Sequence, residues 1–270
     1  MASEDLDRLR RNLETLRLRH VAEHLDEHLR EGKRLKLGHV GFMVRATDAE
    51  VLARSERGAQ QRIAKACFEE LVTLDAFEFK KQPSIDRRQI MDLAELGFID
   101  CCEAVLFFGP SGVGKSHLAT ALGVRACEAG YRVEYHRAPE LFPILHAALA
   151  DDSLDELLEA LARAPLMIVD ELGAGVRKPE QDFGALFYEL VGARHRRGSL
   201  MVVSNFSATD WDSKLGNAPL VTAALDRLLD GAHIIDIPVD APSFRARRKH
   251  GPGRLPRRRL PASVRRYRRR

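Results

Sequence analysis

The pattern of apolar and polar residues changes near residue 100 of this 270-residue chain. Before that point, apolar positions recur mostly every three or four residues, which is typical of one buried face of a helix. From Ala104 onwards, short apolar runs of strand length alternate with longer helical stretches. The pattern therefore predicts a small helical N-terminal region, residues 1–100, and an α/β domain, residues 101–244.

Three helices are expected in the N-terminal region, at about 6–29, 47–65 and 85–96. Leucine and valine form one stripe along the first helix, and Gly32 follows it as an end signal. Thr47 precedes the second helix as a candidate N-cap. In the third helix, Ile90, Leu93 and Leu96 share one face.

The α/β domain is expected to contain five strands, at 105–108, 132–136, 166–170, 200–204 and 233–237. Helices are expected at 116–129, 139–150, 154–162, 180–196 and 220–229. Parallel strands need long crossover connections, which are usually helical. The order of elements therefore predicts a parallel five-stranded sheet with helices on both faces.

A glycine-rich segment lies between the first predicted strand and the helix after it. Residues 109–116 read Gly-Pro-Ser-Gly-Val-Gly-Lys-Ser, which matches the Walker A pattern G-x-x-x-x-G-K-[ST]. Glycines let backbone N–H groups point at phosphate oxygens, and the helix N-terminus favours the same anion. The alternative is a glycine-rich loop without a ligand. We expect a nucleoside triphosphate site whose contacts are Gly109, Pro110, Ser111, Gly112, Val113, Gly114, Lys115, Ser116 and His117.

Two acids, Asp170 and Glu171, end the third predicted strand. The carboxyl ends of parallel strands meet at the sheet edge where the phosphate loop also lies. Asp170 and the Ser116 hydroxyl are therefore candidate ligands of Mg²⁺, and Lys115 is a candidate partner of the outer phosphates. Glu171 is the candidate that polarises the attacking water. Alternatively, the two acids merely end a strand.

Two further polar residues are candidate parts of the site. Asn205 ends the fourth predicted strand, where an amide can hydrogen-bond both the γ-phosphate and the attacking water; alternatively, it caps the following loop. Arg227 lies on the helix before the last strand. It is either an arginine finger that reaches a neighbouring subunit's nucleotide, or one half of a solvated pair with Asp226.

The formal net charge of +4 is unevenly distributed. Residues 245–270 contain twelve Arg, one Lys and no acid, a charge of +13, so residues 1–244 carry −9. Glycine and proline in this basic tail work against a regular helix, and we expect it to be disordered. Two interpretations stay open: a polyanion-binding segment that acts through counterion release, and a low-complexity extension without a role.

Targeting and cysteine features favour the cytoplasm. The longest apolar runs are far too short to cross a bilayer, and the acidic start Met-Ala-Ser-Glu-Asp is unlike a signal peptide. The four cysteines show no C-x-x-C spacing, which argues against a metal site or a simple disulfide framework. We therefore expect a cytoplasmic protein without a membrane partner.

The order of these motifs resembles an AAA+ ATPase. More narrowly, the chain resembles the IstB-type ATPases, the transposition helpers of certain bacterial insertion sequences, which are related to the DnaC-type helicase loaders. The resemblance covers about residues 8–248. Its most specific segments precede Walker A, because Walker motifs alone occur in many folds, and they are 16–20, 73–77, 82–88 and 93–99.

This resemblance implies an ATPase that uses ATP and Mg²⁺, binds double-stranded DNA and assists a cognate transposase. It also implies a homo-oligomer, as a ring or helical filament, with Asn205 as sensor 1, Arg227 as the finger and little or no C-terminal lid. Each cationic cluster that is a candidate for DNA contact is otherwise an ordinary solvated face. These clusters are Arg54, Arg57, Arg62 and Lys65; Lys80 and Lys81; Arg87 and Arg88; and Arg194, Arg196 and Arg197.

Three alternative functions share the same nucleotide site. A replicative helicase loader would favour single-stranded DNA. A nucleotide-gated interaction protein would bind ATP with little turnover, although the intact Glu171 argues against it. A small-molecule kinase would need a substrate-binding lid, which the sequence does not indicate.

Overall fold

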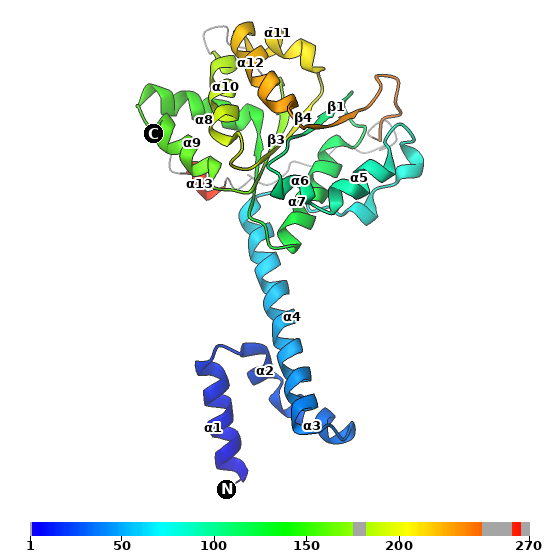
Figure 1. Ribbon diagram of the computed structural model, residues 1–270, viewed down its shortest axis with the longest axis vertical. Coiled ribbons are helices and arrows are strands. Elements are labelled where there is room, and N and C mark those ends of the chain that lie inside the picture. The colour runs from blue at the N-terminus through cyan, green and yellow to red at the C-terminus, as the bar shows by residue number, and fades with distance from the viewer. Residues whose placement is uncertain (1, 175–181, 245–260, 266–270) are drawn as a thin grey trace. The chain divides into compact units, whose positions relative to one another are not determined.

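The computed structural model describes residues 2–174, 182–244 and 261–265 (Figure 1). The chain divides into two compact units, Met1–Gln60 and Gln61–Arg270. We expected this division near residue 100. Within the described residues, none of the helices combines the length and apolar character that a bilayer-spanning helix needs.

The first unit is helical, but its helices differ from those we expected. In place of one helix over 6–29 there are three: α1 (Ala2–Thr15), α2 (Arg19–Glu23) and α3 (Leu25–Arg34). The chain turns at Arg17, whose φ of 59° lies in the left-handed region that ends a helix. Gly32 does not end a helix either. It lies inside α3, where a Cβ would be 2.9 Å from the Phe42 ring.

Helix α4 (His39–Ala66) begins eight residues before Thr47, so the predicted N-cap is wrong. The Thr47 hydroxyl donates instead to the carbonyl of Met43 at 2.8 Å, one turn back along the same helix. A threonine that bonds its own helix in this way needs no cap position. The helix then continues through the boundary between the two units.

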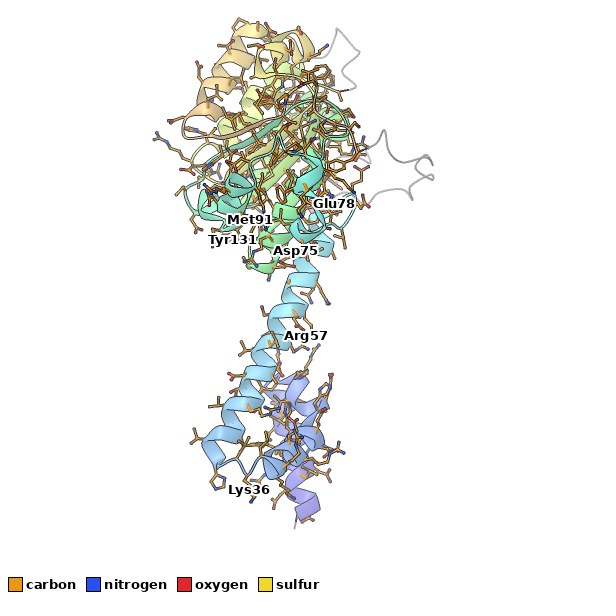
Figure 2. All side chains as sticks on the ribbon, turned by 90° about the vertical axis from the view of Figure 1, so that its right-hand side faces the viewer. Lys36, Arg57, Asp75, Glu78, Met91 and Tyr131 are labelled. Atoms are coloured by element: carbon orange, nitrogen blue, oxygen red, sulfur yellow. The ribbon has the colours of Figure 1, made fainter. Side chains whose placement is uncertain are left out.

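A buried carboxylate holds the first unit together. Glu50 on α4 is 2% exposed and accepts a hydrogen bond of 3.1 Å from the backbone N–H of Val21 on α2. Arg57, one side chain labelled in Figure 2, donates to the same carboxylate at 3.2 Å. Because an unpaired buried charge is costly, these partners fix α2 against α4.

The second unit is built on one parallel sheet in the order β2-β3-β4-β1-β5. The strands are β1 (Val105–Phe108), β2 (Val133–Arg137), β3 (Leu166–Leu172), β4 (Ser199–Ser204) and β5 (His233–Asp236). All five lie within about two residues of the predicted positions. The number of strands and their parallel direction are confirmed.

Apolar side chains cover both faces of the sheet, as expected for buried parallel strands. One face buries Leu106, Val169 and Val202 in a cluster with α8 (Ala138–Ala150), α9 (Leu154–Ala162), α10 (Phe183–Arg194), α11 (Trp211–Leu215) and α12 (Ala218–Leu229). The other face of the sheet buries residues such as Phe107 and Ile168 against α5 (Arg87–Ala94), α6 (Gly97–Asp100) and α7 (Lys115–Glu128). The short 3₁₀ turns are η1 (Leu74–Ala76), η2 (Phe79–Lys81) and η3 (Ala208–Asp210).

Residues 61–100 belong to the second unit because their apolar side chains complete its core. Phe77, Ile85, Ile90 and Leu93 are each at most 6% exposed and share a cluster with Phe107 of β1. Helix α5 is capped by Asp86 and is shorter than the predicted helix at both ends. Thus the predicted boundary near 100 followed the change in secondary structure, whereas the packing boundary lies forty residues earlier.

Part of the basic tail is ordered. Residues Ala262–Arg265 form the short helix α13, in which Val264 is fully buried in the core cluster. The Ser263 hydroxyl donates to Glu134 on the edge strand β2 at 2.6 Å. The expectation of disorder is therefore wrong for this segment, because its apolar residue has a place in the core. The rest of that prediction, at 245–260 and 266–270, lies outside the described residues.

A histidine cluster predicts acid sensitivity of the first unit. The His20 and His24 rings stack with their centroids 4.3 Å apart, and His28 lies edge-on to His20 at 6.1 Å. Burial lowers the pKa of His28, as do His20, His24 and Arg45, against the charge of Glu27. The folded state therefore favours neutral His28, and its stabilisation is lost as pH falls below the ordinary histidine value.

We expect hydrogen exchange in α2 and α3, corrected for its intrinsic pH dependence, to accelerate between about pH 7 and pH 5. A His28→Gln variant should lose most of this pH dependence. The matched control is His39→Gln, which changes an exposed histidine of the same unit. Equal pH dependence in His28→Gln and the unmutated protein would contradict the assignment.

Candidate functional site

The phosphate loop connects β1 to α7 and adopts a backbone that only glycine fits. Gly109, Gly112 and Gly114 have φ values of 135°, 86° and 102°. A Cβ at Gly109 would lie 2.6 Å from the carbonyl oxygen of Ile237, and one at Gly114 would lie 2.5 Å from the Phe77 ring. Gly109 and Gly114 are therefore required by both conformation and space, and Gly112 by its conformation.

Lys115 is held inside this loop. Its Nζ donates to the carbonyls of Gly109 and Pro110, both at 2.7 Å, and to Asn205 Oδ1 at 2.8 Å. The side chain is 4% exposed, so these oxygens offset part of the cost of burying an ammonium group. Lys115, predicted in the Walker A loop, and Asn205, predicted at the end of the fourth strand, thus lie together.

Ser116 and Asp170 also meet. The Ser116 hydroxyl, in the first turn of α7, donates to Asp170 Oδ1 at 3.1 Å. Tyr135 on β2 donates to the other carboxylate oxygen at 2.5 Å, and the Glu171 backbone N–H donates to Oδ1 at 2.7 Å. Burial raises the pKa of Asp170, and these three hydrogen bonds oppose that shift without cancelling it.

This hydroxyl–carboxylate pair has the donor chemistry that Mg²⁺ takes from a protein when substrate phosphates and water supply the remaining ligands. Among the residues that the structure describes, no group of three or more His, Cys, Asp or Glu side chains forms a metal site of its own. The fit of the predicted ligands therefore rests on Ser116 and Asp170 lying in contact beside the phosphate loop.

Glu171 occupies an irregular position on β3. The pairing of β3 with β4 shifts register between Val169 and Leu172, and Glu171 has a left-handed φ of 60°. That conformation costs an ordinary residue about 1 kcal/mol. Bulges of this kind commonly re-aim a side chain beside an active site.

The re-aimed Glu171 carboxylate lies against Arg137, the last residue of β2. Arg137 Nε donates to Glu171 Oε2 at 3.1 Å, and Nη2 contacts the same oxygen. Burial alone would lower the pKa of Arg137, but the hydrogen bond to Glu171 and the charges of Glu171, Glu69 and Glu140 leave it raised. In this arrangement the carboxylate is held by an ion pair.

The loop after β4 is fixed by a buried serine. Ser204 donates to the carbonyl of Leu172 at 2.9 Å and accepts from the indole N–H of Trp211 at 3.0 Å. These bonds join β3, β4 and α11 directly before Asn205. Ser204 and Trp211 therefore position the amide that contacts Lys115.

The other predicted loop residues take separate places. Val113 is fully buried in the core, so it can offer the site only its backbone. The His117 ring faces the 73–77 segment: Nε2 lies 3.2 Å from the Thr73 carbonyl, and the ring stacks edge-on to Phe77. His117 thus links the preceding segment to α7.

Arg227 is not brought to the other site residues within one chain. Its guanidinium stacks 4.5 Å from the centre of the Tyr188 ring and donates to the Tyr188 hydroxyl at 2.9 Å. In the described part of the chain it makes no hydrogen bond or ion pair with Lys115, Asp170, Glu171 or Asn205. The finger role therefore stays a prediction about a neighbouring copy.

Comparison with known proteins identifies the family of this chain. A family model described as IstB-like ATP binding protein matches residues 11–251. The chain belongs to this IstB-like family. A Pseudomonas aeruginosa protein named for ATP binding in insertion sequence IS21 is 34% identical over 239 residues, 88% of this chain and 89% of the relative. One from Bacillus thuringiensis subsp. berliner, named likewise for IS232, is 31% identical over 84% of this chain and 90% of the relative.

A solved structure supports the fold of this IstB-like chain. The crystal structure of DnaI aligns with a TM-score of 0.51 at 20% identity, over 62% of this chain and 90% of that chain. At that identity the likeness concerns the fold alone. The predicted α/β class with a parallel five-stranded sheet is confirmed. The described residues beyond β5, 237–244 and 261–265, contain the single helix α13.

Several predicted cations of this IstB-like chain have internal partners. Arg194 is wrong as a DNA contact: it is 2% exposed and donates to the carbonyls of Leu161, Ala164 and Ser199. Burial lowers its pKa to about 10. Arg197 forms a two-point ion pair with Glu159 at 2.6 and 2.8 Å.

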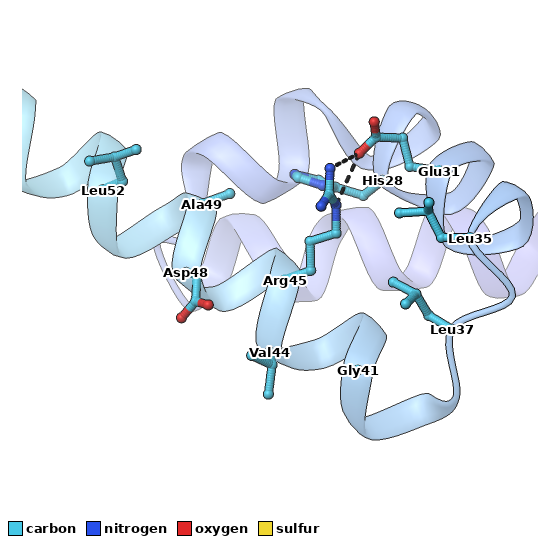
Figure 3. Close-up of a pocket in the computed structure, with 10 residues that line it drawn as sticks. All are labelled: His28, Glu31, Leu35, Leu37, Gly41, Val44, Arg45, Asp48, Ala49 and Leu52. Atoms are coloured by element: carbon cyan, nitrogen blue, oxygen red, sulfur yellow. Dashed lines mark hydrogen bonds and ion pairs between the residues drawn. The ribbon is translucent and has the colours of Figure 1, made fainter.

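A separate hollow of about 490 Å³ lies in the first unit between α3 and α4 (Figure 3). Its wall carries the ion pair of Arg45 with Glu31, beside His28, and otherwise mostly apolar residues. It contains none of the residues predicted for phosphate chemistry. The candidate site is therefore the sheet edge in the second unit.

Sequence reasoning missed Tyr135 and Arg137, which hold the two acids. Both lie on the predicted strand 132–136 or directly after it, two residues apart and so on one face. A polar pair at the carboxyl end of the strand beside the acids was the available signal. It was insufficient because only the sheet order makes β2 the neighbour of β3.

Replacing Tyr135 by Phe should weaken the binding of Mg²⁺ at Ser116 and Asp170. Without its hydrogen bond, worth about 1.5–3 kcal/mol to a charged group, the Asp170 carboxylate loses the contact that holds one of its oxygens in place, and the Asp170 pKa rises further. We expect the Mg²⁺ concentration for half-maximal phosphate release to rise about tenfold at pH 7. The control is Tyr131→Phe, which removes an exposed hydrogen bond to Asp100. An unchanged Mg²⁺ requirement in Tyr135→Phe would contradict this role.

Proposed function

We propose that the chain is an ATP-dependent, DNA-binding AAA+ ATPase that assembles on double-stranded DNA and assists a transposase. The observation that carries the proposal is the convergence of Lys115, Asn205, Ser116 and Asp170 at one sheet edge, in a member of the IstB-like ATP-binding family. The insertion-sequence names of the relatives support the connection to transposition.

Binding would use the residues of the phosphate loop. Its backbone N–H groups and the N-terminus of α7 cradle the phosphates, and Lys115 Nζ exchanges loop carbonyls for phosphate oxygens. Mg²⁺, when bound to Ser116 and Asp170, supplies positive charge that offsets the phosphate oxygens. Asn205, which accepts a hydrogen bond from Lys115, would orient the attacking water.

Glu171 would accept the proton of that water. Its ion pair with Arg137 competes with this role, so we expect slow turnover in the isolated protein. The same observation favours a second candidate function, a nucleotide-gated interaction protein that binds ATP with little hydrolysis. DNA and neighbouring subunits distinguish the two, because they should raise turnover only in the first.

Arg227 would complete the site of a neighbouring copy. A subunit that carries the phosphate loop on one face and the finger on another hydrolyses only when copies meet head to tail. Such heterologous contacts produce rings if they close and helical filaments if they do not. Self-assembly and ATP turnover are then coupled.

The test compares phosphate release with no DNA, duplex DNA and single-stranded DNA at equal nucleotide concentration. We expect duplex DNA to stimulate turnover most, with a stimulation that declines as salt rises. Lys115→Ala, which removes the phosphate cation, should lose ATP binding and turnover in all three conditions. Stronger stimulation by single strands would favour a helicase loader, and ATP binding without turnover in any condition would favour the nucleotide-gated protein.

Subunit mixing tests the finger. Arg227→Ala and Lys115→Ala should each be nearly inactive, because arginine fingers contribute about 10³-fold or more to turnover. When the two folded variants are mixed, some Lys115→Ala subunits present an intact Arg227 to an intact nucleotide site, so we expect partial recovery of phosphate release. Absence of recovery, despite co-assembly in sedimentation, would contradict action between subunits.

A further inference from the structure

Two side chains of β2 hold the acidic pair of β3. Arg137 pairs in register with Asp170, and Tyr135 pairs with Ile168, so both β2 residues lie beside the strand that carries the acids. Tyr135 binds Asp170, and Arg137 binds Glu171. How firmly each carboxylate is held therefore depends on the other contacts of its β2 partner.

Both β2 residues also contact the segment that directly follows α4. The Phe68 ring packs edge-on to the Tyr135 ring, with centroids 5.8 Å apart. It also lies against Gly123 of α7, where a Cβ would approach it to 2.8 Å. Phe68 thus anchors this segment between β2 and α7, immediately after the left-handed turn at Cys67, whose φ is 61°.

The next residue, Glu69, reaches the other partner. Its carboxylate lies 3.9 Å from Arg137 Nη1, and Glu140 on α8 lies 3.7 Å from the same nitrogen. Arg137 therefore faces three carboxylates with one guanidinium, and in this structure its closest bonds go to Glu171. All four side chains are about one-third exposed, so each pair is weak and the choice among them is finely balanced.

We propose that Glu69 is a positioning residue that competes with Glu171 for Arg137 and thereby sets how readily Glu171 serves hydrolysis. With Arg137 on Glu171, the guanidinium occupies the carboxylate oxygen Oε2. With Arg137 shifted to Glu69, Glu171 is released. Since α4 leads directly into Phe68 and Glu69, a partner that displaces the end of α4 changes this balance. The inference rests on the proposed ATPase function.

Substitutions that remove the charge at 69 or 137 test the competition by steady-state phosphate release without DNA. Arg137→Gln should raise kcat about three- to fivefold, the equivalent of one exposed ion pair, with KM for ATP unchanged. Glu69→Gln removes the competitor, so kcat should fall about twofold, again without a change in KM. A merely damaged fold would not raise kcat while leaving KM intact.

The matched control is Glu70→Gln, which makes the same charge change one residue away and should leave kcat unchanged. The double variant Glu69→Gln, Arg137→Gln should match Arg137→Gln alone, because Glu69 acts through Arg137. Additive effects in the double variant, or a wild-type kcat in Arg137→Gln, would overturn the inference while leaving the ATPase proposal intact.

A second measurement keeps the two proposals distinguishable. If the unmutated protein releases no phosphate under any condition, the proposed function fails. The competition is then read from the Arg137 Nε resonance in isotope-labelled protein, which should shift in Glu69→Gln and not in Glu70→Gln. An unmoved resonance in Glu69→Gln would overturn the inference on its own.

Discussion

The parallel pairing of β1 with β4 and β5 is the constraint on which the candidate site depends. β1 lies between these strands, in register from Val105 with Met201 and His233, and both faces of the sheet are buried. Because buried backbone groups must pair with one another, the strands cannot slide without losing hydrogen bonds and exposing apolar side chains. The carboxyl ends of β1, β3 and β4 are thereby held at one edge.

That edge concentrates charge where water is scarce, and the surrounding groups are arranged to tolerate it. Lys115 is surrounded by carbonyl and amide oxygens, while Asp170 accepts three hydrogen bonds. These contacts come from the protein's own groups, and they offset part of the cost of burying each charge. The left-handed Glu171 and the bulge beside it are the places where regular strand geometry is given up for this arrangement.

Helix α4 has residues in both units of the chain. Residues 39–60 of this helix belong to the helical unit, where Glu50 is buried among partners from α2 and α4, and residues 61–66 belong to the second unit. Directly after it, Phe68 and Glu69 contact the two residues that hold the acids.

The local sequence determined the phosphate loop, the strand that leads into it and the helix that leaves it. The reason is that Gly109, Gly114, Lys115 and Ser116 meet conformational and chemical demands that few other residues satisfy. The apolar runs likewise determined five parallel strands, since burial on both faces leaves a recognisable pattern.

Only the tertiary structure decided which strands are neighbours, and therefore that Tyr135 and Arg137 hold Asp170 and Glu171. It also shows that residues 61–100 belong to the second unit, because Phe77 and Ile90 pack in the apolar core of that unit. Helix and strand patterns report which face of an element is buried, but they do not report against what it is buried. That choice is made by long-range packing, which no local window of sequence contains.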